Sequence, residues 1–306
     1  MRTLIATWRN ISRPRNWVIA IPYVWLLAFF AIPFVIVLKI SFSSMQPIQP
    51  GYAPLWQWVE ETQRLVATIN VDNYQALWRN NLYVSTFIYS LKVAAVSTVL
   101  CLLIGYPMAY AIARSAPTTR NLLLMLIILP FWTSFLLRVY AWVGLLKSNG
   151  VINNALLALG WIDQPLTLLY TDFAVYVGIV YSYLPFMILP LYANLEKHDF
   201  TLLEAAADLG AKPMTSFFKV TLPLSLPGIV AGCLLVFIPA VGEYVIPSLL
   251  GRTDQLMIGT VLSAQFFSAR NWPVASAVAI VLLLLLLLPI LLFQRYQRRE
   301  LEAAKR

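Results

Sequence analysis

The amino-acid sequence predicts an all-α, polytopic membrane protein with six transmembrane helices. Hydrophobic residues make up 60% of the chain and charged residues only 11%, whereas soluble domains carry ~25% charged residues. Several apolar runs reach the ~20 residues that a helix needs to cross a bilayer. These runs lack the ~10-residue alternation of apolar and polar positions that marks the strands of a membrane β-barrel.

Six apolar segments, rich in Leu, Ala and Val, are expected to cross the membrane. Prolines and glycines interrupt several of them, and such breaks are tolerated where neighbouring helices or water satisfy the freed backbone groups. They suit a bundle that opens and closes a path, and equally a static bundle of kinked helices. Residues 1–306 are expected to form a single transmembrane domain. The expected spans are residues 18–38, 90–112, 122–145, 173–194, 227–249 and 273–293.

The placement of basic residues predicts the orientation of these spans. Although the formal net charge is +9, the basic residues gather at both ends of the chain and in the connections after the second and fourth spans, so nucleic acid is not expected as a partner. Cytoplasmic loops carry an excess of Lys and Arg, which places both termini in the cytoplasm. The cytoplasmic set is Arg2, Arg9, Arg13, Arg15, Arg114, Arg120, Lys197, Lys212, Lys219, Arg295, Arg298, Arg299, Lys305 and Arg306, against Arg64, Arg79, Lys147, Arg252 and Arg270 on the other side.

A polar segment at residues 195–224 connects the fourth and fifth spans, and its sequence predicts a short helix. Thr201 and Glu204 have the spacing of a capping box, in which each side chain accepts the backbone N–H of the other residue. Residues 202–209 then predict about two helical turns, with three alanines that favour the helix and leave one face thin. Gly210 suits the position after the helix, where a positive φ is wanted.

A second short helix is expected to follow the first. Pro213 can take its first position, where a missing N–H costs nothing, and Leu222-Pro223 is expected to end it before the fifth span. Two helical turns are marginal alone in water, so the segment is expected to pack on a surface, and its thin alanine face suits a groove in a partner protein. An ordinary capped helix at the membrane interface is the alternative.

The same segment resembles a known family. The pattern E-A-A-x3-G-x9-I-x-L-P is the cytoplasmic signature of the integral-membrane subunits of binding-protein-dependent ABC importers, and this chain matches it with Val220 in the Ile place. The resemblance implies a type I ABC importer permease fold in which this loop is a coupling helix seated in a cleft of the ATPase. The residues that it implicates are Glu204, Ala205, Ala206, Asp208, Gly210, Leu222 and Pro223.

A narrower resemblance points to the polyamine branch of this family, and most of all to putrescine importer permeases. It rests on residues 129–142, 149–169, 236–251 and 270–278. It implies import of putrescine or spermidine across the bacterial inner membrane. It also implies three partners: a second permease subunit in a heterodimer, a cytoplasmic ABC ATPase dimer and a periplasmic polyamine-binding protein. A permease for another small cationic or organic solute stays open, as does an ion-coupled secondary transporter.

Two ionisable residues are expected within the membrane. Glu243 lies in the fifth span and Arg138 at a similar depth in the third, and charged groups there are costly and mark functional sites. A polyamine path needs acidic groups and aromatic faces that attract cations, which Glu243, Tyr244, Trp132 and Tyr140 would supply if the two spans are adjacent. Three interpretations stay open: an Arg138–Glu243 ion pair, a cation site at Glu243, and a gate in which the two residues switch partners.

The sequence argues against several other activities. It holds no G-x-x-x-x-G-K-[ST] motif, so ATP hydrolysis is expected in a partner and this chain is not expected to be an enzyme. Its one histidine, His198, leaves no Ser–His dyad, and Cys101 and Cys233 are expected to pack as apolar side chains. Neither a metal site nor a cofactor is expected. Secondary transporters usually show paired repeats and several ionisable groups near the middle of the membrane. This sequence has only two such ionisable groups, Glu243 and Arg138.

Overall fold

The computed structural model describes residues 14–48, 50–59, 64–199 and 201–303. The chain divides into two compact units, Met1–Arg79 with Gln265–Leu283 and Asn80–Ala264 with Leu284–Arg306. Some of the basic residues that predict the orientation lie outside the described residues, namely Arg2, Arg9, Arg13, Lys305 and Arg306.

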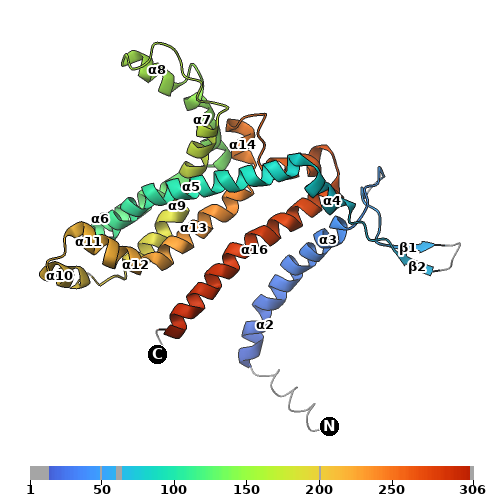
Figure 1. Cartoon of the computed structure of the whole chain (residues 1–306), viewed down its shortest axis with the longest axis horizontal. Coiled ribbons are helices and arrows are strands. Elements are labelled where there is room, and N and C mark those ends of the chain that lie inside the picture. The colour runs from blue at the N-terminus through green and yellow to red at the C-terminus, as the bar shows by residue number, and fades with distance from the viewer. Residues whose placement is uncertain (1–13, 49, 60–63, 200, 304–306) are drawn as a thin grey trace, which may run out of the picture. The chain divides into compact units, whose positions relative to one another are not determined.

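The first unit begins with a long apolar helix. α2 (Pro14–Leu26), the π-helical turn η1 (Leu27–Ala31) and α3 (Ile32–Ser41) follow one another directly, as the blue ribbon of Figure 1 shows. Residues Val18–Ser41 are long and apolar enough to cross a membrane. None of the window that qualifies as a span is buried inside the structure, so its apolar side chains are free to face lipid.

A small hairpin and a short helix follow, in the stretch between the first two expected spans. β1 (Trp56–Val59) and β2 (Arg64–Ala67) pair antiparallel, with Trp56 opposite Ala67. After them comes α4 (Asp72–Arg79). The sequence did not predict the hairpin, but these strands lie outside the spans, and the membrane-spanning part of the described chain is helical as expected.

The second unit is built on three helices that lie side by side in Figure 1: α5 (Asn81–Ala113), α9 (Asp172–Leu195) and α13 (Leu226–Val241). Their side chains form a buried apolar core that includes Cys101, Ala109, Met187, Leu191 and Val236. Both α5 and α9 start at a side-chain cap, because Asn80 Oδ1 accepts from Leu82 N at 3.0 Å and Thr171 Oγ1 accepts from Ala174 N at 3.3 Å.

A glycine sets how closely two of these helices approach. A Cβ added to Gly232 on α13 would lie 2.7 Å from Sδ and 3.1 Å from the backbone O of Met187 on α9, so Met187 would have to shift. Small residues at helix contacts are a usual way for membrane helices to pack, because little hydrophobic force acts between helices in lipid.

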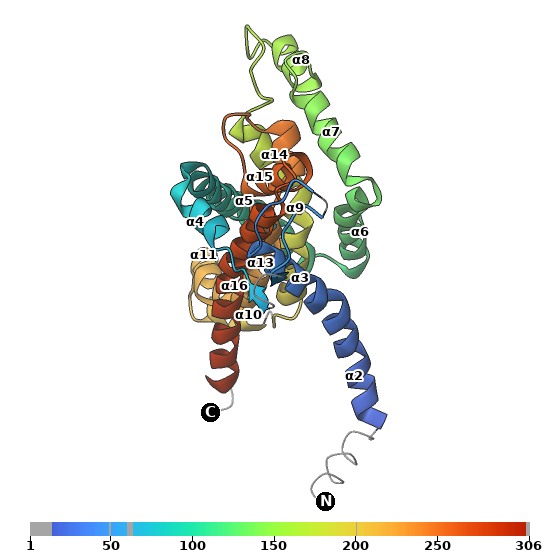
Figure 2. The same ribbon diagram turned by 90° about the vertical axis from the view of Figure 1, so that its right-hand side faces the viewer.

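Shorter elements complete the described chain. α6, α7 and α8 follow one another along one side of the second unit (Figure 2), and α10 to α12 form the segment between α9 and α13. The bounds are α6 (Pro117–Ile128), η2 (Leu129–Trp132), α7 (Phe135–Leu146), α8 (Val151–Ala158), α10 (Thr201–Asp208), α11 (Pro213–Ser216), η3 (Phe217–Thr221), α12 (Leu222–Leu224), α14 (Val245–Leu250), α15 (Ile258–Ser263), η4 (Ala264–Ser268) and α16 (Trp272–Ala303).

The described helices supply the predicted spans, although two of them are broken. Four are single helices, Val18–Ser41, Asn81–Ala113, Asp172–Leu195 and Trp272–Arg295. Two more are bent pairs: Pro117–Trp132 with Phe135–Ala158 at 90°, and Pro213–Leu224 with Leu226–Val241 at 65°. Counting each pair as one span gives the six that the sequence predicts.

Helix breaks also fall inside the expected spans 122–145 and 227–249, in line with the prolines that interrupt them. In the first, Thr133 and Ser134 have extended ψ angles, so they separate η2 from α7. In the second, α13 ends at Val241 and a new helix begins at Val245. Hydropathy does not detect either break, because the residues at the breaks are themselves mostly small or apolar.

Candidate functional site

The polar segment between α9 and α13 has the short helix that the sequence predicts, with a different N-terminal cap. α10 begins at Thr201, and Oδ1 of Asp199 accepts the Thr201 N–H at 3.0 Å. That hydrogen bond lowers the pKa of the Asp199 carboxyl. The predicted capping box is wrong, because the Thr201 N–H is donated to Asp199 Oδ1 and not to the Glu204 carboxylate.

The predicted end of this helix is confirmed. Gly210 has φ +77°, its N–H donates to Ala207 O at 2.8 Å, and Ala211 N donates to Ala206 O at 3.0 Å. These two bonds are the pattern of a Schellman motif, which satisfies carbonyls that the helix leaves free. As predicted, Pro213 is the first residue of the next helix, α11.

The predicted end of this second helix at Leu222-Pro223 holds to within one residue. The helix runs through the π-helical turn η3 into α12 and stops at Leu224. Ser225 then occupies the bend, where its Oγ donates to Leu222 O at 2.9 Å and shares a 2.9 Å hydrogen bond with Tyr106 Oη on α5. Pro223 fits because it lies in the first turn of α12, where a missing N–H costs little.

The coupling-loop candidates lie at the surface of α10 and its end. Glu204, Ala205, Asp208 and Gly210 are exposed and Ala206 is half-buried. Beside them, Leu209 is 89% exposed and lies outside the candidate spans, and Met214, in the first helix of a bent pair, is 68% exposed. Apolar side chains exposed close together are one feature of interaction sites.

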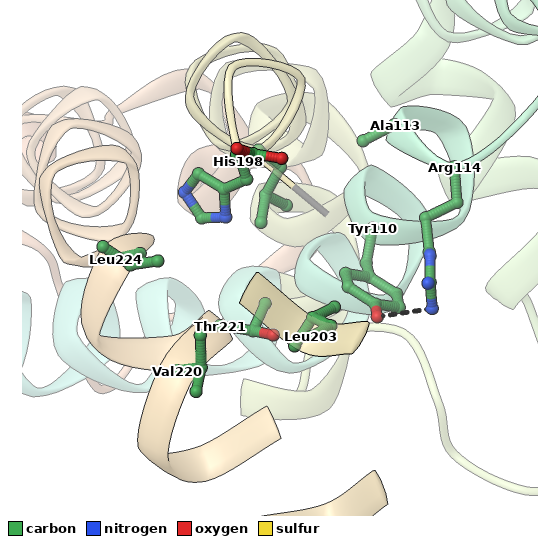
Figure 3. A pocket seen from close by; sticks show the side chains of 10 residues that line it. Tyr110, Ala113, Arg114, His198, Leu203, Val220, Thr221 and Leu224 are labelled. Carbon is green, nitrogen blue, oxygen red and sulfur yellow. Dashed lines mark hydrogen bonds between the residues drawn. The ribbon is translucent and has the colours of Figure 1, made fainter. Parts of the chain in front are cut away.

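The inner side of the same loop packs on the end of α5. Leu203, Val220, Thr221 and Leu224 line a small pocket together with His198, Tyr110 and Ala113, as Figure 3 shows. The space left among these residues is only about 10 Å³. The loop therefore has a tightly packed inner side and an open outer side.

An ion pair fastens the base of this loop to the preceding helices. Arg120 Nη1 on α6 donates to Glu196 Oε1, just after α9, at 2.7 Å, and Arg120 Nη2 donates to Ala113 O at the end of α5 at 3.1 Å. One guanidinium thus connects three helices beside the coupling-loop candidates. From the sequence, Arg120 served only as one of the basic residues that predict the orientation of the spans.

The second candidate site surrounds Glu243, in the break between α13 and α14. Glu243 is 7% exposed. Its Oε1 accepts the N–H groups of Tyr244 at 3.1 Å, Val245 at 3.0 Å and Ile246 at 3.4 Å, and its Oε2 accepts the Tyr183 hydroxyl at 2.5 Å. This carboxylate caps α14 and satisfies backbone groups that the broken helix leaves free.

Glu243 and Arg138 face a common cavity of about 470 Å³ without forming an ion pair. The Arg138 guanidinium carbon instead lies 4.9 Å from the centre of the Phe131 ring and 5.8 Å from that of Phe135. The ion-pair interpretation is therefore wrong for this structure. The cavity is lined by Phe131, Phe135, Arg138, Ser182, Tyr183, Phe186, Pro239, Gly242, Glu243, Tyr244 and Val245.

The aromatic residues predicted for this site are only partly the right ones. Tyr244 lines the cavity, whereas Trp132 and Tyr140 are absent from its lining and are 79% and 57% exposed. The rings that do line it, and that sequence reasoning missed, are Phe131, Phe135, Tyr183 and Phe186. The i, i+3 spacing of Phe135 and Arg138 on α7 was a usable signal. Nothing in the sequence joins Tyr183 to Glu243.

Aromatic faces around a buried carboxylate suit an organic cation better than a metal ion. Ring faces attract ammonium groups, and a volume of this size lies within the ~300–1,000 Å³ of small-molecule sites. Among the described residues, no group of three or more His, Cys, Asp or Glu side chains is placed to hold a metal.

Comparison with known proteins identifies the family. Residues 101–302 match the model of the "Binding-protein-dependent transport system inner membrane component" family. This chain belongs to that family. It is thus a multi-pass bacterial inner-membrane protein and a transport component rather than an enzyme.

Individual relatives narrow the comparison. The spermidine/putrescine transport system permease protein PotB of Haemophilus influenzae is 42% identical over 277 residues, which cover 90% of this chain and 92% of PotB. PotB of Escherichia coli K12 is 38% identical over 274 residues, covering 90% and 94%. The inner membrane ABC transporter permease protein YdcU of E. coli K12 is 32% identical over 79% of this chain and 80% of YdcU.

Solved structures confirm the fold. A bacterial ABC transporter involved in alginate import contains a chain with TM-score 0.65 and 19% identity, and the match covers 96% of this chain and 99% of that one. A chain of the MetNI methionine ABC transporter in an inward-facing conformation has TM-score 0.54 and 21% identity, covering 74% and 97%. The predicted type I importer permease fold is confirmed.

Proposed function

We propose that this chain is a permease subunit of an ATP-driven importer that carries putrescine and spermidine into the cytoplasm. The observation that supports it most is the 42% identity over 90% of the chain to a spermidine/putrescine permease. The aromatic cavity with its buried carboxylate supports a cationic substrate, since both features attract ammonium groups. The path residues proposed for it are Glu243 and Tyr244, with Phe131, Phe135 and Tyr183 in place of Trp132 and Tyr140.

The proposed partners are a second permease subunit, a cytoplasmic ABC ATPase dimer and a periplasmic polyamine-binding protein. The outer face of α10 suits the ATPase, because it combines Glu204 and Asp208 with the exposed apolar side chains Leu209 and Met214. The packed inner side joins this face to α5, so a movement of the partner would reach the spans through rigid contacts. Ala205, Ala206, Gly210, Leu222 and Pro223 complete the proposed coupling segment.

Uptake into proteoliposomes that hold the complete complex tests this function. Labelled putrescine is expected to accumulate only with ATP and the binding protein, to be unaffected by a protonophore, and to be competed by spermidine. Uptake that follows an ion gradient without ATP would instead identify a secondary carrier. ATP-driven uptake of another solute, with no competition by polyamines, would identify a permease for a different substrate.

The variant Ala206→Glu is the matched test of the coupling surface. A bulky charge on the thin face of α10 is expected to leave the complex assembled but to separate ATP hydrolysis from uptake. Ala158→Glu is the control, because Ala158 ends α8, a short helix elsewhere in the chain. Equal uptake in the two variants would contradict the proposed coupling role.

A further inference from the structure

Arg138 brings a positive charge to the wall of the Glu243 cavity without an acidic partner. Its Nε is buried and has no hydrogen-bond partner, and no ion pair joins its guanidinium to an acidic group in the described part of the chain. The contacts that the structure gives this guanidinium are the faces of Phe131 and Phe135. Such ring contacts are weak compared with a buried ion pair, so this charge is held loosely.

Glu243 is engaged elsewhere and does not neutralise Arg138. Its two oxygens accept three backbone N–H groups and the Tyr183 hydroxyl. The cavity therefore has a negative group held by four hydrogen bonds at the Glu243 side and a positive group without an acidic partner at the Arg138 side. A free cation entering it would be attracted by the first and repelled by the second.

We propose that the Arg138 guanidinium is a tethered cation that occupies the aromatic wall where an ammonium group of the substrate binds, so that substrate and Arg138 exclude one another. This inference rests on the proposed function, since it concerns an organic cation in the same cavity. A guanidinium and an alkylammonium are both attracted to ring faces. Two like charges against the same pair of rings repel, and repulsion is strong where little water screens it.

The break between η2 and α7 gives Arg138 a way to leave. Phe131 lies before the break at Thr133 and Ser134, while Phe135 and Arg138 lie after it on α7. A change in the 90° bend would therefore move the two rings apart and draw the guanidinium off the Phe131 face. Bends of this kind are where helices absorb changes in backbone angle.

Equilibrium binding of putrescine tests the proposal. The sample is the purified complex of the two permease subunits and the ATPase dimer in nanodiscs, without the binding protein. Arg138→Gln removes the charge and is expected to tighten putrescine binding by about three- to tenfold, the scale of one desolvated cation–π contact. Arg252→Gln is the matched control, because it removes an exposed arginine that pairs with Asp254 and does not line the cavity, and its Kd is expected to stay as in the wild type. Unchanged or weaker binding by Arg138→Gln would overturn the proposal.

A competition experiment on two variants keeps the test independent of how either one folds. Methylguanidinium mimics the removed side chain, so it is expected to compete with putrescine for Arg138→Gln and for Arg138→Met, and much less for the wild type. Absence of competition in both variants would contradict the shared position. A wild-type complex that neither binds nor imports putrescine would refute the proposed function. Putrescine import with no gain in the Arg138 variants would refute this inference alone.

Discussion

Glu243 illustrates how one residue can serve structure and transport together. Its Oε1 satisfies three backbone N–H groups at the start of α14, which would otherwise lack acceptors within the membrane. Its Oε2 reaches Tyr183 on α9 and lines the cavity. The acceptor role and the charge of Glu243 can therefore be tested separately, by one substitution that keeps an acceptor oxygen and one that removes it.

Glu243→Gln and Glu243→Ala are expected to differ. Gln keeps an oxygen for the backbone N–H groups, so the complex should assemble, while loss of the charge should lower putrescine uptake by about tenfold. Ala leaves those N–H groups unsatisfied at about 1–3 kcal/mol each, so less complex should assemble. Size-exclusion chromatography and uptake measure the two effects, and normal uptake by Glu243→Gln would exclude a role for the charge.

Substitution of Gly210 is expected to have an effect because of its backbone conformation, and not because an added side chain would clash. Its φ is +77°, and an added Cβ would meet nothing within 4 Å. Gly210→Ala should therefore cost about 1–2 kcal/mol, the penalty of a left-handed L-residue, and should loosen the end of α10. More ATP hydrolysed per putrescine imported is the expected readout. Gly144→Ala, also with nothing within 4 Å and without a positive φ, should behave as the wild type.

Asp199 predicts a pH dependence of α10. The pKa of its carboxyl is lowered in the folded chain by the Thr201 N–H, so the cap is fully present above the ordinary Asp pKa of ~3.9. It is lost as the pH falls through the lowered folded value. Hydrogen exchange should show steady protection of the first turn of α10 from neutral pH to about pH 4, then a decline. Asp199→Asn, which keeps an acceptor but does not titrate, should not show the decline.

At the scale of the elements, the Arg120–Glu196 ion pair matters more for the helices that it joins than for its contribution to stability. Both side chains of the Arg120–Glu196 pair are partly exposed, at 23% and 42%, and such pairs contribute only about 0–1 kcal/mol. Arg120 also donates to a backbone carbonyl at the end of α5. Its removal should therefore loosen three helices with little loss of overall stability.

Arg120→Ala is expected to raise the ATP hydrolysed per putrescine imported several-fold while the thermal midpoint of the complex changes little. Glu196→Gln keeps an acceptor for Arg120 and should stay close to the wild type. Coupled ATPase and uptake assays on the same preparations measure the ratio. A large loss of thermal stability without a change in this ratio would show that the pair is only structural.

The segment between α9 and α13 shows where sequence reasoning about elements succeeds and fails. Gly210 and Pro213 were predicted correctly, because a positive φ and a missing N–H are properties of one residue in its immediate surroundings. The capping box failed because Asp199, two residues earlier, competes for the same backbone donor. The end at Leu222-Pro223 was predicted to within one residue, since α12 stops at Leu224.

At the scale of the whole molecule, the helical class and the number of spans follow from the lengths of the apolar runs. The cavity does not, because it depends on contacts between residues far apart in sequence, such as Tyr183 with Glu243. Hydropathy finds an intramembrane Glu and Arg but does not show which partner each chooses. Here backbone N–H groups and aromatic rings compete successfully against the ion pair.

The orientation of the whole chain can be tested with single cysteines. Both native cysteines, Cys101 and Cys233, lie within helices and are buried or half-buried, so they should react slowly. A cysteine at the exposed Asp208 should react with an impermeant maleimide only after the membrane is opened, because the 195–224 segment is predicted to be cytoplasmic. A cysteine at Asp254 should react in intact spheroplasts, and the reverse pattern would contradict the predicted topology.

The length of α5 relative to the bilayer places the coupling segment with respect to the lipid. Its 33 residues span ~50 Å at 1.5 Å per residue, whereas the hydrocarbon layer is only ~30 Å thick. Tilting takes up part of this mismatch. Because the expected span is residues 90–112, the rest of the excess lies at the end of α5 that begins at Asn81. Tyr110 and Ala113, on which the coupling segment packs, are then expected close to the membrane surface, so a thicker membrane would be expected to hinder docking of a soluble partner.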